Sequence, residues 1–260
     1  MTALEFRLYP IAEVYAGMLL WPWERAREVL GAWHELTRIA PDELMSVGRL
    51  LQVPPLPQIP EFLRGGQFVV VEVAHLGDPA DADRLLAGLR HLAPAMDTVA
   101  TIPAPQLQEL HMDPPGPIPG DGDGFLLDTL DAGALDALVA AAGPGSGSPL
   151  VSVELRHLGG ALARPDAAHG ALATLDGEFA LFGVGVPMGP GALDAIRAQF
   201  GRLRDALEPW NGGRAFLNFA EQEFDTETAF GADAYARLRA AKRAYDPADL
   251  FRANHRNRVS

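Results

Sequence analysis

The segment Val151-Ser152-Val153-Glu154-Leu155-Arg156-His157-Leu158 alternates between two kinds of side chain. In a β-strand, successive side chains point to opposite faces, so the valines and Leu155 share one face, and Glu154 and Arg156 share the other. A strand buried on both faces would instead be almost continuously apolar. The segment therefore predicts an antiparallel sheet with one face packed against helices and the other face not covered by them.

The rest of the chain supplies the other elements of such a sheet. Strand-like alternation or β-branched residues mark 14–21, 68–75 and 178–186. Apolar residues at helical spacing mark 23–38, 79–91, 132–142, 191–207 and 228–244. Asp78 followed by Pro79 is a typical helix start. We therefore predict an α+β fold, with an antiparallel β-sheet, helices packed on one face and a C-terminal helical segment.

The stretch 113–124 is rich in proline, glycine and aspartate, and it shows no helical or strand period. Asp121-Gly122-Asp123-Gly124 resembles the start of a calcium loop, but Phe125 stands where the third ligand would be. The sequence therefore predicts a loop here, ending in an ordinary turn.

Composition excludes several classes of partner. Among 260 residues, 48% are hydrophobic and 21% charged, the net charge is −13, and Lys242 is the only lysine. This chain is long enough to bury a substantial core. Contacts to phosphate backbones and anionic membrane surfaces need clustered basic side chains, so we expect binding to neither nucleic acid nor membrane.

Metal and thiol chemistry are not expected either. The chain has no cysteine, which excludes disulfides, thiolate metal sites and a cysteine nucleophile within it. Its seven histidines are scattered without the spacing of metal ligands, so we predict no metal site. No signal-peptide pattern opens the sequence, and we expect a soluble, cytoplasmic protein.

The ends of the chain carry a resemblance to a known family. Phe216-Leu217-Asn218-Phe219 and the tail Tyr245-Asp246-Pro247-Ala248-Asp249-Leu250-Phe251-Arg252-Ala253-Asn254-His255 resemble the C-terminal segment of berberine-bridge-enzyme-like, FAD-linked oxidoreductases. Thr2-Ala3-Leu4-Glu5-Phe6-Arg7-Leu8-Tyr9-Pro10 resembles the last strand of that family's flavin domain. Two internal stretches also resemble the family, and all these pieces occur in the same order as in the family: Leu110-His111-Met112-Asp113-Pro114-Pro115 and Glu154-Leu155-Arg156-His157-Leu158-Gly159-Gly160.

The resemblance implies three parts: a remnant of the flavin domain at 1–12, a substrate-type α+β domain at 13–207 and a berberine-bridge-like segment at 208–260. It reaches the substrate-side half of the family's architecture only. The FAD that the family uses would therefore not be held by this chain alone.

On the sheet, the resemblance places Glu154, Arg156 and Phe182 over the flavin side as substrate-binding residues. The alternative for Glu154 and Arg156 is a surface charge pair. Glu178, at the start of the strand that carries Phe182, is the candidate catalytic base by comparison with an acidic residue of plant members. The alternative is a solvated glutamate at a strand start.

The cofactor-binding candidates are Asn218, Phe219 and Asn254, again by resemblance. An asparagine amide both donates and accepts hydrogen bonds, which suits the mixed edge of a flavin. Some plant members have a catalytic tyrosine where this chain has Phe219, so deprotonation by a tyrosine at that position is excluded. The alternative for Phe219 is core packing.

Two functions follow as hypotheses. The first is the substrate-side half of an FAD-dependent oxidase acting on a small molecule, with the flavin domain supplied in trans. The second is a stand-alone ligand-binding or redox-independent protein that has kept the fold and forms a homodimer. In both, we expect an exposed apolar patch on the free sheet face that includes Phe182, Val184, Phe219 and Phe251.

Overall fold

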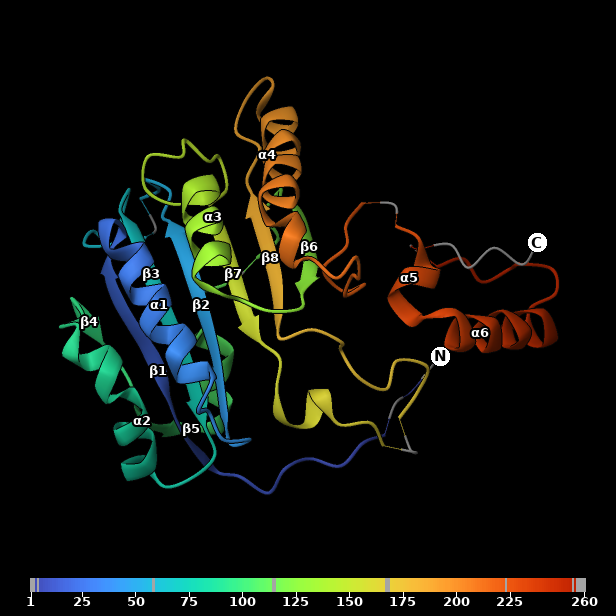
Figure 1. Ribbon diagram of the computed structural model, residues 1–260, viewed down its shortest axis with the longest axis horizontal. Helices are drawn as coiled ribbons and strands as arrows, with labels where there is room; N and C mark the ends of the chain where they lie inside the picture. Colours follow the sequence, from blue (N-terminus) through green and yellow to red (C-terminus); the bar gives the residue numbers. More distant parts are fainter. Residues whose placement is uncertain are drawn as a thin grey trace.

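The computed structural model describes residues 3, 5–57, 59–113, 116–166, 169–222, 224–253 and 255. Within these residues an eight-stranded antiparallel sheet has the strand order β4-β1-β3-β2-β7-β8-β6, with β5 also paired to β1 (Figure 1). The strands are β1 (Glu13–Pro22), β2 (Leu44–Gln52), β3 (Gln67–His75), β4 (Met96–Asp97), β5 (Ala100–Pro103), β6 (Asp121–Leu127), β7 (Ser152–His157) and β8 (Phe179–Gly185).

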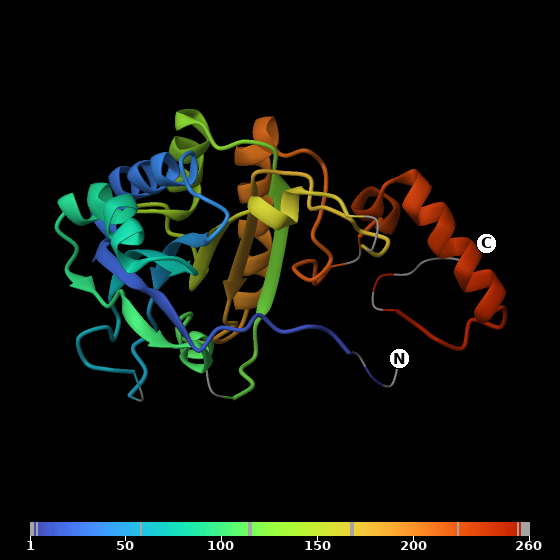
Figure 2. The same ribbon diagram turned by 90° about the horizontal axis from the view of Figure 1, so that it is seen from below.

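Helices cover one face of this sheet (Figures 1 and 2). They are α1 (Ala26–Thr37), α2 (Pro79–His91), α3 (Ala132–Ala142) and α4 (Ala192–Leu207). Two more, α5 (Thr226–Phe230) and α6 (Ala232–Tyr245), form a C-terminal helical segment beside the sheet. The predicted α+β fold is confirmed.

The main core lies between the sheet and these helices. Trp21 and Trp33 are fully buried there, together with Leu19, Leu30 and Phe179. The predicted start of α2 is confirmed, because the Asp78 carboxylate accepts a hydrogen bond from the Ala80 amide at 2.9 Å. The alternation of β7 is also confirmed, since Val153 and Leu155 belong to this core and Glu154 does not.

Strand β2 was not predicted, although it lies in the middle of the sheet. Its helix-facing side carries Ser46 and Gly48 where an apolar residue would be expected. The Trp33 indole donates a hydrogen bond to Ser46 Oγ at 3.0 Å, and a Cβ on Gly48 would lie 2.7 Å from the Trp33 ring. Ser46 and Gly48 are small because the Trp33 ring occupies the space above them. The helix-facing positions of β2 are therefore not all apolar, and the alternation typical of a strand is not visible in the sequence.

The prediction of a loop ending in a turn at Asp121–Gly124 was wrong, because these residues form the buried first half of β6. Asp121 and Asp123 face α4, where Arg197 and Arg204 pair with them at 3.2 and 2.7 Å. A buried carboxylate is tolerated only when it is paired. The acidic residues that suggested a turn are therefore partners for arginines far along the sequence.

The predicted final helix over 228–244 is two helices. Gly231 has φ of 76°, a left-handed conformation that glycine adopts without strain, and it separates α5 from α6. Figures 1 and 2 show α6 projecting away from the sheet.

The opposite face of the sheet, called the open face below, carries no helix of the α1–α4 layer but is not bare. At one end, Leu63 and Ile59 of a loop pack on Met18, Leu20 and Val70. At the other end, Leu126, Leu158 and Ala180 are packed against three further side chains: Leu175, Phe216 and Phe219.

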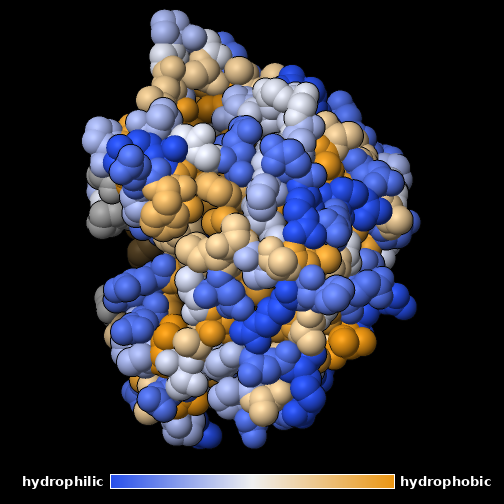
Figure 3. Space-filling model, turned by 90° about the vertical axis from the view of Figure 1, so that its left-hand side faces the viewer, coloured by the Kyte–Doolittle hydropathy of each residue, from blue (hydrophilic) through white to orange (hydrophobic). Residues whose placement is uncertain are grey.

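The exposed apolar side chains lie mainly outside this face. Phe182, Val184 and Phe219 are only half-exposed, whereas Phe251 is 75% exposed. On the side of the molecule that bears α2 and β4, polar and apolar residues are interspersed (Figure 3). No helix among the described residues is long and apolar enough to cross a membrane.

Candidate functional site

Three adjacent strands bring charged residues together on the open face between the two apolar ends. Arg49 on β2 lies directly opposite Glu154 on β7, and Glu72 comes from β3 on the other side of β2. The Arg49 and Glu72 side chains are each 4% exposed, and Glu154 is 2% exposed. Buried charged groups are stable only when they are paired, and these side chains are paired within the same group of residues.

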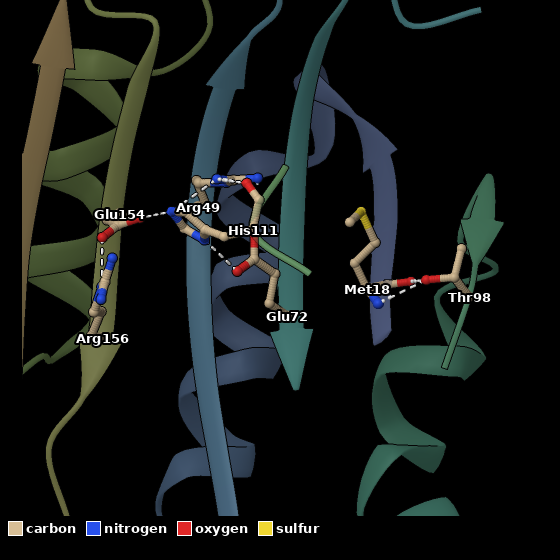
Figure 4. Close-up of polar contacts among 7 residues, drawn as sticks. All are labelled: Met18, Arg49, Glu72, Thr98, His111, Glu154 and Arg156. Atoms are coloured by element: carbon tan, nitrogen blue, oxygen red, sulfur yellow. Dashed lines mark hydrogen bonds and ion pairs between the residues drawn. The ribbon is translucent and has the colours of Figure 1, made fainter. Parts of the chain in front are cut away.

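His111 completes this group from a loop. It follows a 3₁₀ helix at Ala104–Glu109 and reaches over the sheet (Figure 4). Its Nδ1 lies 2.6 Å from Glu72 Oε2, and its Nε2 lies 2.9 Å from Glu154 Oε2. Its backbone carbonyl accepts a hydrogen bond from Arg49 Nη1 at 3.1 Å. One imidazole therefore bridges carboxylates of two separate strands.

This bridge fixes the charge state of the ring. Burial favours neutral histidine, but the hydrogen bonds to Glu154 and Glu72 outweigh it and raise the pKa of His111 to about 9. Burial likewise opposes ionisation of Glu154, yet the hydrogen bond from His111 and the charge of Arg156 leave its pKa lowered. At neutral pH, His111 is an imidazolium and Glu154 a carboxylate.

Arg156 joins the same network at its solvent side. Its Nε donates to Glu154 Oε1 at 2.6 Å, and its guanidinium lies over the Phe219 ring, 5.0 Å from the centroid. Phe219 also packs against Phe182 and Phe216, with centroids 4.8 and 5.0 Å away. We call Arg49, Glu72, His111, Glu154 and Arg156 the charge cluster, and Phe182 and Phe219 its aromatic edge.

The structure thus brings four of the candidate site residues together: Glu154, Arg156, Phe182 and Phe219. The alternative of a surface charge pair was wrong for Glu154, which is almost fully buried. Core packing describes only part of Phe219, because its ring is half-exposed and carries Arg156.

Two of the other three candidates are described by the structure, and neither belongs to the charge cluster or its aromatic edge. Glu178 is exposed just before β8, where its carbonyl accepts a hydrogen bond from the Leu158 amide at 2.8 Å. Its role as a base stays a prediction. Asn218 is exposed next to Phe219, and Asn254 lies outside the described residues.

Sequence reasoning did not select Arg49, Glu72 or His111 as site residues. Arg49 lies on the strand that was not predicted, and Glu72 lies within an otherwise apolar run, Val69-Val70-Val71-Glu72-Val73. A single carboxylate among β-branched residues was the available indication, because such a group is buried only with a partner. In the part of the chain that the structure describes, no set of three or more histidine, aspartate or glutamate side chains could hold a metal ion.

Part of the C-terminal segment matches a known protein family. Residues 215–256 match the family model described as "Berberine and berberine like". No curated protein matches the chain by sequence. The matched residues include Phe219 of the aromatic edge and Phe216, which packs against it.

Solved structures match over nearly the whole chain. A variant of BBE-like 1 from Physcomitrella patens matches with a TM-score of 0.74 and 13% identity, covering 96% of this chain and 55% of that one. A chitooligosaccharide oxidase matches with a TM-score of 0.70 and 17% identity, covering 96% and 56%. The grass pollen allergen Phl p 4, described as having glucose dehydrogenase activity, matches with a TM-score of 0.69 and 14% identity, covering 94% and 54%.

The chain therefore spans about half the length of these structures. At such identities the likeness shows the fold. The C-terminal segment thus resembles the berberine-like family model, and nearly the whole chain shares the fold of berberine-bridge-enzyme-like structures.

Proposed function

We propose that this chain is the substrate-side half of an FAD-dependent oxidoreductase that acts on a small molecule. The charge cluster on the open face carries the proposal, because a buried network that reaches solvent at His111 and Arg156 is a rigid polar surface beside aromatic rings. Binding sites for small molecules commonly combine such apolar walls with a few fixed polar groups. The similarity to an oxidase and a dehydrogenase supports the reaction class.

The residues present fit part of a flavin site. Phe219 offers a ring fixed by three neighbours, and Asn218 offers an exposed amide beside it. These two would contact the flavin ring, and the rest of its binding site would come from residues outside these 260 or from a separate polypeptide. Bound flavin would supply the hydride acceptor.

The chain's own residues would bind the substrate and handle its proton. Glu154 is held ionised by His111 and Arg156, so it is a weak proton acceptor at neutral pH and is suited to orienting a substrate. His111, held as an imidazolium, gives both ring N–H groups to Glu72 and Glu154, so it would act on the substrate through its positive charge and not as a hydrogen-bond donor. Exposed Glu178 remains the proposed base.

Exposed apolar side chains suggest where a partner would bind. Tyr245, Leu250 and Phe251 at the C-terminal end are 88, 79 and 75% exposed, and Phe6 and Tyr9 are 74 and 75% exposed. Such surface normally marks an interface. A flavin domain would cover it under the first hypothesis, and a second copy of this chain would cover it under the stand-alone alternative.

The test is to purify the tagged chain from its native cells and record the visible spectrum of what co-elutes. We expect a flavin-containing polypeptide whose absorbance bleaches anaerobically with an oxidisable carbohydrate. The Phe251→Asp variant should recover less of it, and exposed Glu35→Gln on α1 should recover as much as the wild type. A flavin-free homodimer would overturn the proposal in favour of the stand-alone binding protein.

A further inference from the structure

The charge cluster has an excess of positive charge. Arg49, His111 and Arg156 carry positive charge, because guanidinium groups stay protonated in proteins and the pKa of His111 is raised. Two carboxylates, Glu72 and Glu154, oppose them. In formal charges the cluster is left with one uncompensated cation, although the chain as a whole carries −13.

Arg156 is the residue through which the excess positive charge of the cluster can contact a ligand. Its side chain is 41% exposed, whereas Arg49 is 4% exposed. Only its Nε is engaged by a carboxylate within the described part of the chain, and Glu154 is that partner. The two terminal nitrogens of the guanidinium are left for another acceptor.

The Arg156 side chain is also held in place. The hydrogen bond to buried Glu154 fixes one edge of the guanidinium, and the Phe219 ring supports its face at 5.0 Å. A guanidinium with a fixed plane loses less conformational entropy on binding and matches the two oxygens of a carboxylate. Phe182 and Phe219 pack on each other beside Arg156 and are half-exposed, so their exposed parts could contact the rest of the ligand.

We infer that this site takes a substrate bearing a carboxylate, which Arg156 binds through its two terminal nitrogens while the ligand's ring lies on Phe182 and Phe219. The inference rests on the proposed function for where the substrate binds. The negative charge of the substrate is inferred from Arg156. It makes Arg156 a specificity-determining residue. His111, whose side chain is 26% exposed, lies on the other side of Glu154, and its positive charge adds to the attraction.

The test uses the full chain without flavin, so it is independent of the proposed redox role. Calorimetric affinities are measured for two matched pairs: D-glucuronate with D-glucose, and benzoate with benzyl alcohol. We expect the carboxylate of at least one pair to bind about tenfold more tightly than its neutral partner, as a charge-assisted hydrogen bond allows. Arg156→Gln should abolish that preference and Arg156→Lys should weaken it.

The control is Arg164→Gln, which removes an exposed arginine, paired with Asp42, from outside the cluster. It should leave the preference unchanged, and circular dichroism should show that all the variants fold. Equal affinity for both members of each pair, or a preference that survives in folded Arg156→Gln, would overturn the inference. If the chain prefers the carboxylate but recovers no flavin-containing polypeptide from its native cells, the inference stands and the proposed oxidoreductase role alone is contradicted.

Discussion

The Arg156 guanidinium lies over the Phe219 ring, 5.0 Å from its centroid, and this contact joins strand β7 to the C-terminal segment. Phe219 lies within the stretch that matches the berberine-like family model. Cation–π contacts of this kind contribute about 0.5–2 kcal/mol. The C-terminal segment therefore helps to build the site on the open face.

Replacing Phe219 by alanine should lower the free energy of unfolding by roughly 1–3 kcal/mol, because the ring packs on Phe182, Phe216 and Arg156 but is only half-buried. Urea unfolding measures it. The matched control is Phe251→Ala, which removes a ring that is 75% exposed and should change stability by less than about 0.5 kcal/mol. Equal effects of the two substitutions would show that Phe219 does not hold the segment to the sheet.

Glu72→Gln should be strongly destabilising. Arg49 Nη2 lies 2.9 Å from Glu72 Oε1 with both side chains 4% exposed, so neutralising the carboxylate leaves a buried guanidinium short of negative charge. Breaking a buried pair in this way costs about 3–5 kcal/mol. Glu35→Gln, at an exposed pair on α1, should cost less than about 1 kcal/mol. A similarly small loss for Glu72→Gln in urea unfolding would mean that the cluster is solvated.

Stability should fall on the alkaline side through His111. Its pKa is raised to about 9 in the folded chain, against about 6.5 when unfolded. A raised pKa contributes stability that is fully present below about pH 6.5 and is lost as the pH rises through about 9. Free energies of unfolding between pH 6.5 and 9.5 should therefore decline more steeply for the wild type than for His111→Gln. Parallel curves would contradict the bridged imidazolium.

Two glycine-to-alanine substitutions should act in opposite directions. Gly48→Ala places a Cβ 2.7 Å from the Trp33 ring and should destabilise by about 1–3 kcal/mol. Gly88 lies inside helix α2 with no heavy atom within 4 Å of a built Cβ, so Gly88→Ala should stabilise by about 0.5–1 kcal/mol. Thermal unfolding of both variants checks the close packing of Trp33 on β2, and a stabilising Gly48→Ala would disprove it.

Glu178→Gln tests the proposed base in the flavin-loaded complex. Loss of a general base should slow flavin reduction by about 10²–10⁴-fold with substrate affinity nearly unchanged. Exposed Glu43→Gln is the control and should react like the wild type. An unchanged rate in Glu178→Gln would transfer the role to another group.

Sequence patterns predicted the elements with a clear local signal, such as the apolar stripe of α4 and the β-branched run of β3. They failed where a distant side chain supplies what the local pattern lacks. Gly48 and Ser46 belong to a strand because Trp33 fills the space above them, and Asp123 belongs to one because Arg204 pairs with it. Neither partner can be identified from local sequence.

The site was also only partly predictable from the sequence. Glu154 and Arg156 share one strand face, so their alternation indicated a common surface. Arg49 and Glu72 reach the same surface through strand order, and His111 through a loop that crosses the sheet. Strand order and loop paths are tertiary properties, which explains why the sequence indicated one edge of the charge cluster and not its centre.

The most direct test of the central claim is the flavin content of the recombinant chain after incubation with FAD and gel filtration. The proposed division of the enzyme predicts that no flavin absorbance co-elutes with the chain, because most of the cofactor site lies outside these residues. Flavin retained in stoichiometric amount would contradict it, since the chain would then hold the redox cofactor by itself.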